Sequence, residues 1–473
     1  MPRGHDAAAG RRRARGGFAL RRPSPAPEQK QLLVADDHGR PLTLRPEQFA
    51  PKQQGGGWGP FTDSFLRANR DALEGLELKP ELVGTAQGAV LRLAPGGRAG
   101  AVPLRSAHAG QVVGGVVVRP RFGWAGVGRV LSETGWHAAP RFLDLPLVPG
   151  SGREVPPWVL AGPVIARIAE LLRNLRRGYQ QREALLQSPR GTVLWPLYAT
   201  GPLVRGEWHQ LPCRFPDLGA DPRLREAAKW CLERVRRGLL IVGGVDHLAL
   251  TLATEAHRLL LTLLDVAARV PQRGELERAG NFVDAVLRRG LEAMGWVVDE
   301  RGLGGGRELD GLAWQLSLPQ LWEAYVERIM REEASLVGAQ VRVGRLGETV
   351  LPVYWSDPSQ RALSHLVPDI VLQNRSSIQI VDAKYKSHFA ELDEGGWRSL
   401  TEDIREAHRA DFHQILAYAA LYEAKEIRAT LVYPLRRSTF DALSARHRDV
   451  ARAELMHGGR RVIAELRGLP FGR

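Results

Sequence analysis

The sequence predicts an α/β protein: a small β-rich N-terminal domain, a mostly helical middle region, and a last third in which a mixed sheet is flanked by helices. Three observations predict it. Short apolar runs broken by Gly and Pro fill residues 61–160, apolar residues recur at helical spacing within 161–305, and strand-like runs alternate with helical ones over 306–440. Such an order in the last third is typical of an α/β layer.

Length and charge set the frame for these elements. The chain has 473 residues, 44% of them hydrophobic, which is enough for two or three domains with a core in each. Its net charge of +14 favours a polyanionic partner, either nucleic acid or an anionic membrane surface. Residues 1–25 contain seven Arg and one Asp, so we expect residues 1–60 to form a basic disordered tail and a linker.

Several classes of protein are disfavoured. The sequence has no apolar run of about 18 residues and no secretory leader, which predicts a cytoplasmic protein without a membrane partner. Cys213 and Cys231 belong to no CxxC pair or Cys/His cluster, so we expect reduced structural thiols rather than a zinc site. No GxxxxGK[ST] motif is present, so any nucleotide-hydrolysing motor is expected to be a separate protein.

The N-terminal domain is predicted from strand-like runs such as AVLRLAP, AGAVPL and QVVGGVVVRPRFGWAGVGRVL within residues 61–160. We interpret it as a candidate contact for a partner or for DNA. Its tryptophans, among them Trp58, Trp124 and Trp158, are expected in the core, with base stacking as the alternative.

The middle region, residues 161–305, is predicted to be mostly helical. Val164, Ile168, Leu171 and Leu175 recur at three- and four-residue spacing with Arg between them, which indicates an amphipathic helix. Further helices are predicted at 222–237, 246–269 and 281–294. The glycine-rich stretch RGLGGGRELDG at 301–311 predicts a domain boundary.

The last domain, residues 306–440, begins with a predicted helix at 318–334 and is followed by an extension over 441–473. The other expected elements are strands at 340–345, 349–355, 366–373 and 377–386, a helix at 401–424 and a strand at 427–434.

Two aspartates mark the ends of neighbouring predicted strands. In a hairpin that turns near Arg375 and Ser376, Asp369 lies directly opposite Asp382. Two close carboxylates repel each other unless a cation lies between them, and hard oxygen ligands suit Mg²⁺ or Mn²⁺. Lys384 follows Asp382 by two residues and therefore shares its face of the strand, where an ammonium can stabilise developing negative charge. The pattern predicts a metal-dependent phosphodiesterase centre; an ordinary ion pair between Asp369 and Lys384 is the alternative.

These motifs resemble the PD-(D/E)xK nuclease superfamily. Pro368-Asp369 and Asp382-Ala383-Lys384 match its signature, and Gln414 and Tyr418 match the QxxxY element of the RecB-like branch. Residues 317–434 resemble the McrC family, the nuclease component of McrBC-type restriction systems, and a weaker resemblance reaches back to about 178.

The resemblance implies a site and a function. It implies Asp369, Asp382, Glu323 and the carbonyl of Ala383 as metal ligands, with Glu327 as the competitor of Glu323. Lys384 would be the catalytic lysine, and Gln414 and Tyr418 would position the substrate or their helix, although Tyr418 can also be read as a core residue. The implied protein is a DNA endonuclease subunit acting with a separate McrB-like GTPase or ATPase. A stand-alone repair nuclease and a DNA-binding module that does not cut are the alternatives.

Overall fold

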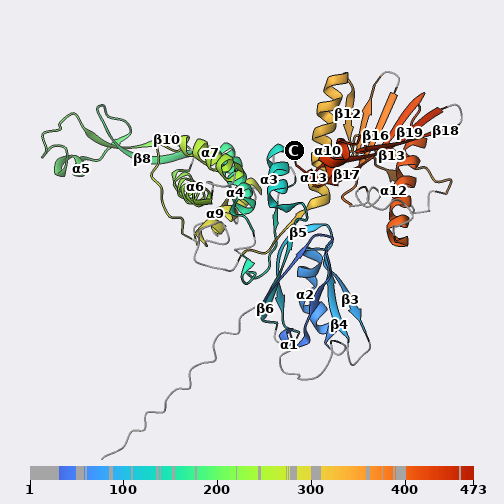
Figure 1. The fold of residues 1–473 in the computed structure, drawn as a ribbon. Coiled ribbons are helices and arrows are strands. Elements are labelled where there is room, and N and C mark those ends of the chain that lie inside the picture. The colour runs from blue at the N-terminus through green and yellow to red at the C-terminus, as the bar shows by residue number, and fades with distance from the viewer. Residues whose placement is uncertain are drawn as a thin grey trace, which may run out of the picture.

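The computed structural model describes residues 31–472 apart from short breaks, of which those of five residues or more are 50–57, 277–284, 300–310, 358–362 and 390–400. Figure 1 shows a mixed α/β protein with three parts: an N-terminal part in blue, a helical part in green, and a C-terminal sheet in orange and red. Residues 301–310 of the predicted glycine-rich boundary and the basic tail over 1–25 lie outside the described residues.

The N-terminal part contains two sheets and helix α2 (Thr62–Gly75). The buried side chains of the sheets and the helix form one core. One sheet has the order β1-β6-β5-β11-β7 and the other β2-β4-β3. The strands are β1 (Gln31–Asp36), β2 (Leu42–Leu44), β3 (Lys79–Val83), β4 (Val90–Ala94), β5 (Arg98–Arg105), β6 (Val112–Arg119), β7 (Arg141–Phe142) and β11 (Trp314–Ser317).

Two predictions for this part were wrong. The linker expected to reach residue 60 contains β1, β2 and the short helix α1 (Pro46–Phe49), because QLLVAD and LTL supply apolar side chains to the two sheets. The run after β6 was predicted as strand but forms helix α3 (Gly123–Glu133). Gly123 turns the chain with a φ of +77°, and Val127, Val130 and Leu131 then face the core at helical spacing.

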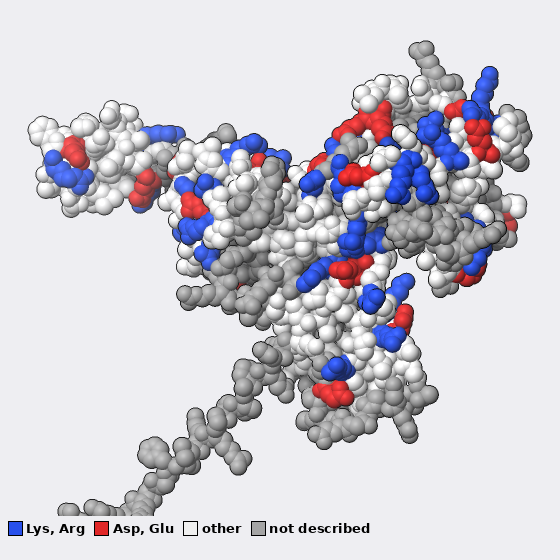
Figure 2. Space-filling model, viewed as in Figure 1, with Lys and Arg blue, Asp and Glu red and all other residues white. Residues whose placement is uncertain are grey.

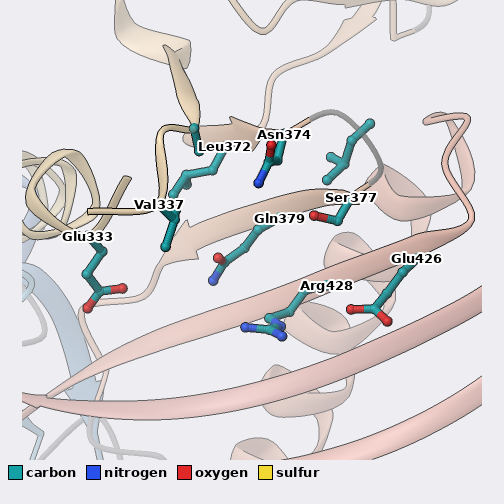
Figure 3. Close-up of a pocket in the computed structure, with 10 residues that line it drawn as sticks. Glu333, Val337, Leu372, Asn374, Ser377, Gln379, Glu426 and Arg428 are labelled. Carbon is teal, nitrogen blue, oxygen red and sulfur yellow. The ribbon is translucent and has the colours of Figure 1, made fainter. Parts of the chain in front are cut away.

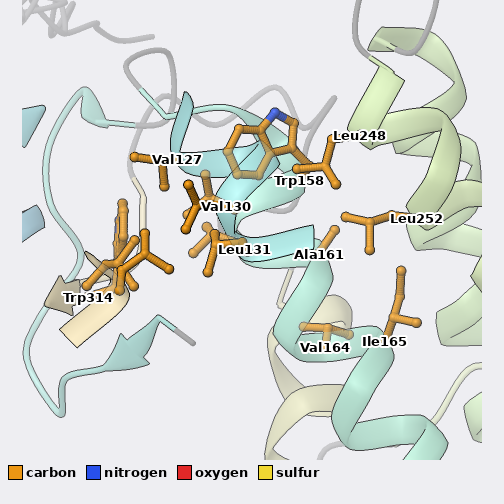
Figure 4. Close-up of a cluster of buried hydrophobic side chains, with 14 of the residues drawn as sticks. Val127, Val130, Leu131, Trp158, Ala161, Val164, Ile165, Leu248, Leu252 and Trp314 are labelled. Carbon is orange, nitrogen blue, oxygen red and sulfur yellow. The ribbon is translucent and has the colours of Figure 1, made fainter. Parts of the chain in front are cut away.

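A shared core joins the three parts. Figure 4 shows Trp158 packed between α3 and helix α7 (His247–Leu261), with Trp314 of β11 on the far side of α3. Trp58 and Trp158 are fully buried, as the core interpretation predicts. Burial of large aromatic side chains is among the largest apolar contributions to stability, so these contacts hold the parts together.

The middle region is helical except for one β-rich segment between two of its helices. Its helices α4 (Pro157–Asn174), α6 (Pro222–Val242), α7 and α9 (Ala285–Val298) pack on one another. Between α4 and α6 the chain forms an arm that projects to the left in Figure 1. The arm consists of β8 (Gly178–Leu186), β9 (Thr192–Val193), α5 (Trp195–Thr200) and β10 (Leu211–Gly219), with β10 central in a three-stranded sheet.

The C-terminal sheet has the order β12-β15-β16-β17-β19-β18. The β12-β15-β16 pairs and the β18-β19 pair are antiparallel, whereas β16, β17 and β19 run parallel. The strands are β12 (Gln340–Val343), β15 (Ile370–Gln373), β16 (Ser377–Ala383), β17 (Glu426–Leu435), β18 (Val450–His457) and β19 (Arg460–Pro470). The sequence interpretation of 441–473 as an extension beyond the domain was therefore wrong, because β18 and β19 complete this sheet.

Helices cover the two faces of the C-terminal sheet. Helix α10 (Leu318–Val337) buries one face in the shared core, and α12 (Glu402–Ala420) covers the other face over a core of its own. Helix α13 (Arg437–Ser444) follows β17, and a short hairpin of β13 (Leu351–Pro352) and β14 (His365–Leu366) precedes β15. Among the residues described, no helix has the length and apolarity needed to span a membrane.

Candidate active site

The two aspartates lie opposite each other at the open end of the hairpin formed by β15 and β16, away from its turn. Ile370 pairs with Val381, and continuing this register by one residue places Asp369 opposite Asp382. The backbone N–H of Ala383 donates to Asp369 Oδ2 at 2.8 Å, which fixes that carboxylate at the end of β16. The turn predicted at Arg375 and Ser376 lies outside the described residues.

Three carboxylates act on one another at this edge. Burial, and after it the negative charges of Asp382 and Glu323, raise the pKa of Asp369 to about 8. Burial also raises the pKa of Asp382 and of Glu323. Buried like charges favour protonation unless a cation compensates them, so the sequence-predicted acids form an electrostatically coupled group.

Lys384 connects this group to helix α12. Its Nζ lies 2.6 Å from Asp382 Oδ2 and donates to Gln414 Oε1 at 2.9 Å. The amide of Gln414 in turn donates to the Tyr418 hydroxyl at 2.7 Å. Burial alone would lower the pKa of Lys384, but the carboxylates of Asp382 and Asp411 outweigh it and raise that pKa, so the side chain is held as an ammonium.

Asp411 is a residue of this site that the sequence interpretation missed. Its side chain is buried, accepts from Lys386 Nζ at 2.8 Å through each oxygen, and lies 3.9 Å from Lys384 Nζ. Its spacing of three residues before Gln414 places both on one face of α12, which is the signal that could have found it. The ammonium of Lys386, two residues beyond Lys384, is thereby paired with Asp411.

The structure separates the two glutamates that competed for a metal-ligand role. Glu327 accepts from Arg345 at 2.7 Å and from Arg331 at 2.9 Å. These bonds outweigh the effect of burial and lower its pKa. Burial raises the pKa of Glu323, and the negative charge of Asp382 raises it further. Glu323 therefore fits the acidic group better than Glu327 does.

The donor set suits a hard divalent cation. Asp369, Asp382 and Glu323 offer carboxylate oxygens, the ligand type that Mg²⁺ and Mn²⁺ prefer. In this arrangement Lys384 neutralises Asp382, and among the described residues no three His, Cys, Asp or Glu side chains converge closely enough to form a ready-made metal site.

A hollow of about 320 Å³ lies at the other end of the same strands, as Figure 3 shows. It is lined by Ser377 and Gln379 of β16, by Glu426 and Arg428 of β17, and by Glu333 of α10. Because Ser377 begins β16 while Asp382 stands near its end, this hollow is separate from the acidic group.

Comparisons with known proteins agree with the resemblance seen in the sequence. The family model of the McrBC 5-methylcytosine restriction system component matches residues 304–434, which confirms the resemblance over that range. No curated protein matches the chain.

Two solved structures from Thermococcus gammatolerans are similar to it. One is a half-complex from a tetradecameric assembly of McrB AAA+ hexamers with bound McrC, with 13% identity, a TM-score of 0.39, and coverage of 93% of this chain and 95% of the other. The other is the McrBC complex, with 12% identity, a TM-score of 0.26, and coverage of 64% and 87%.

Proposed function

We propose that this chain, whose residues 304–434 match the McrBC family model, is the DNA-cleaving subunit of a McrBC-like restriction system. The observation that carries the proposal is the convergence of Asp369, Asp382 and Lys384 at one edge of the C-terminal sheet. A mixed sheet with α10 on one face and α12 on the other supports a PD-(D/E)xK nuclease core.

Each residue of the site has a role in this proposal. Asp369, Asp382, Glu323 and the carbonyl of Ala383 hold Mg²⁺ or Mn²⁺, which when bound lowers the pKa of a water and polarises the scissile phosphate. Lys384 places its ammonium beside the developing negative charge. Gln414 positions Lys384 by accepting a hydrogen bond from its ammonium, and Tyr418 fixes the orientation of the Gln414 amide.

Partner and substrate complete the proposal. The net positive charge supports DNA as the substrate, and Figure 2 shows Lys and Arg side chains spread over the visible face among fewer acidic ones. An McrB-like NTPase is the proposed partner. The tip of the arm exposes a group of large apolar side chains, which is typical of a protein-binding surface. They are Trp195, Leu197, Leu203, Val204 and Trp208.

Plasmid cleavage by the purified chain tests the proposal. We expect cutting that needs Mg²⁺ or Mn²⁺, increases with the product of the neighbouring gene, and is lost in Asp382→Asn and Lys384→Met. Arg446→Gln, which replaces an exposed residue in the turn that follows α13, serves as the control that retains cutting.

The outcomes separate the alternatives. Cutting without any partner or nucleotide would favour a stand-alone repair nuclease. DNA binding without cutting, under every metal and partner condition, would favour a DNA-binding module.

A further inference from the structure

A hollow lined by arginines lies where the N-terminal part meets the C-terminal sheet. Its volume is about 510 Å³, and Arg121, Arg129, Arg436 and Arg437 line it without any Asp or Glu among the described lining residues. Four arginines lining one space give it an excess of positive charge, which favours binding of an anion.

Close backbone packing builds the hollow. Helix α3 runs so near the chain end that a Cβ on Gly126 would lie 3.1 Å from the Phe471 carbonyl oxygen. The rings of Phe122 and Phe471 stack at 4.8 Å beside this contact. The hollow is therefore part of the junction between two packed elements and not a gap between loose loops.

The arginines differ in what already neutralises them. The guanidinium of Arg121 lies 3.5 Å from the Asp37 carboxylate, and Arg437 pairs with Asp441 at 3.0 Å on the surface. Arg129 and Arg436 are exposed, and neither forms an ion pair within the described part of the chain. These two cations are available to a ligand.

The hollow shares a sheet edge with the candidate active site. Strands β16 and β17 are parallel, with Ala383 opposite Val432. Arg436 stands four residues beyond Val432, roughly 13 Å along the strand at about 3.3 Å per residue. That length corresponds to about four nucleotides of one DNA strand at 3.4 Å each. Ligands of α/β proteins bind outside the carboxyl ends of parallel strands, which is where both features lie.

We propose that this arginine hollow binds backbone phosphates of the DNA on which the candidate site acts, a few nucleotides from the scissile bond. The inference rests on the proposed function for the identity of the ligand. Apart from the arginines, the described lining consists of Phe, Gly, Ala and one Ser, so it offers few groups that could recognise a base. Phosphate contacts of this kind set the register of the duplex without reading its sequence.

The test is DNA binding by the full chain carrying Asp382→Asn, which separates binding from cleavage. A fluorescently labelled duplex is titrated at several salt concentrations with Arg129→Gln/Arg436→Gln. The matched control is Arg92→Gln/Arg446→Gln, which removes two exposed arginines from the same two parts of the chain but outside the hollow. Arg129→Lys/Arg436→Lys keeps the charge, and melting curves establish that every variant is folded.

We expect the variant Arg129→Gln/Arg436→Gln, called the hollow variant, to bind the duplex about tenfold more weakly at low salt. The slope of log K against log salt should become less steep by about two, since each phosphate contact contributes about 0.9 to it. The control and the Lys variant should stay near the parent. Equal affinity and slope in the hollow variant and the control would overturn the proposal, even if the wild-type chain cuts DNA. Loss of cutting in every assay, with arginine-dependent binding retained, would instead count against the nuclease.

A competition experiment distinguishes binding of duplex phosphates from binding of a free nucleotide. Millimolar GTP, ATP or inorganic pyrophosphate should leave the labelled duplex bound. Displacement by one of them, in the parent but not in the hollow variant, would assign the hollow to a small phosphate ligand and overturn the DNA assignment.

Discussion

The guanidinium of Arg121 lies 4.5 Å from the ring centroid of Tyr385, so a residue of the N-terminal part covers the residue that directly follows Lys384. The Asp37 carboxylate accepts from the backbone N–H of Arg121. Burial, and then the charge of Asp37, raises the pKa of the Tyr385 phenol, so it stays protonated. The N-terminal part thereby contacts the end of the strand that carries the candidate site.

Replacing Tyr385 should loosen that contact. We expect Tyr385→Leu to lower the free energy of unfolding by about 2–4 kcal/mol, from lost aromatic packing and the lost cation–π contact. Tyr385→Phe, which keeps the ring under Arg121, should lose less than half of that. Urea unfolding measures both, and equal losses in the two variants would show that the hydroxyl, and not the ring, makes the contact.

Glu323 and Glu327 should respond oppositely to removal of their charge. Glu327→Gln leaves Arg331 and Arg345 without their shared carboxylate, so we expect a stability loss of about 1–3 kcal/mol, reduced from the fully buried case because both arginines are partly exposed. Glu323→Gln should instead weaken Mn²⁺ binding and cleavage by at least about tenfold with little loss of stability. Calorimetric Mn²⁺ titration beside urea unfolding checks both, and the reverse pattern would exchange the two roles.

Much of the candidate site follows from local sequence. Alternation along a strand places Asp382 and Lys384 on one face, and a hairpin register brings Asp369 opposite Asp382, so these relationships need no knowledge of the rest of the fold. Asp411 was missed because its partner, Lys386, is 25 residues away on another element. Only the packing of α12 on the sheet brings the two together.

The domain boundaries depended on long-range pairing and were predicted less well. Strand β11 joins β5, more than 200 residues earlier, through Trp314 opposite Ala101. No local pattern specifies that pairing. The hairpin of β18 and β19 did leave a signal, because Gly458-Gly459 separates two strand-like runs, but residues 441–473 were interpreted as an extension beyond the domain.

The two cysteines should be inert in the folded chain. Cys213 and Cys231 are both fully buried, and burial raises the pKa of the Cys231 thiol, which disfavours the reactive thiolate. We expect no reaction with a thiol-specific chromogenic reagent under native conditions and two reactive thiols per chain in guanidinium chloride. Rapid labelling of one thiol in the native chain would show that the structure around that thiol, the arm for Cys213 or α6 for Cys231, opens locally.

The shifted pKa of Asp369 makes metal-free stability depend on pH. Its folded pKa of about 8 lies above the ordinary value of 3.8, so the folded state retains a proton that the unfolded state has released. The resulting stabilisation is complete below about pH 3.8 and is lost as pH rises through about 8.

We therefore expect the free energy of unfolding in EDTA to fall between pH 5 and pH 8 more steeply for the wild type than for Asp369→Asn. Asp71→Asn, at an exposed position of α2, should keep the wild-type slope. Mg²⁺ should bind more tightly as pH rises over this range, because binding must displace the proton from Asp369, and the ion should restore stability at pH 8. Urea unfolding across this pH range, with and without Mg²⁺, checks the prediction. A wild-type slope that Asp369→Asn leaves unchanged would assign the pH dependence to other groups.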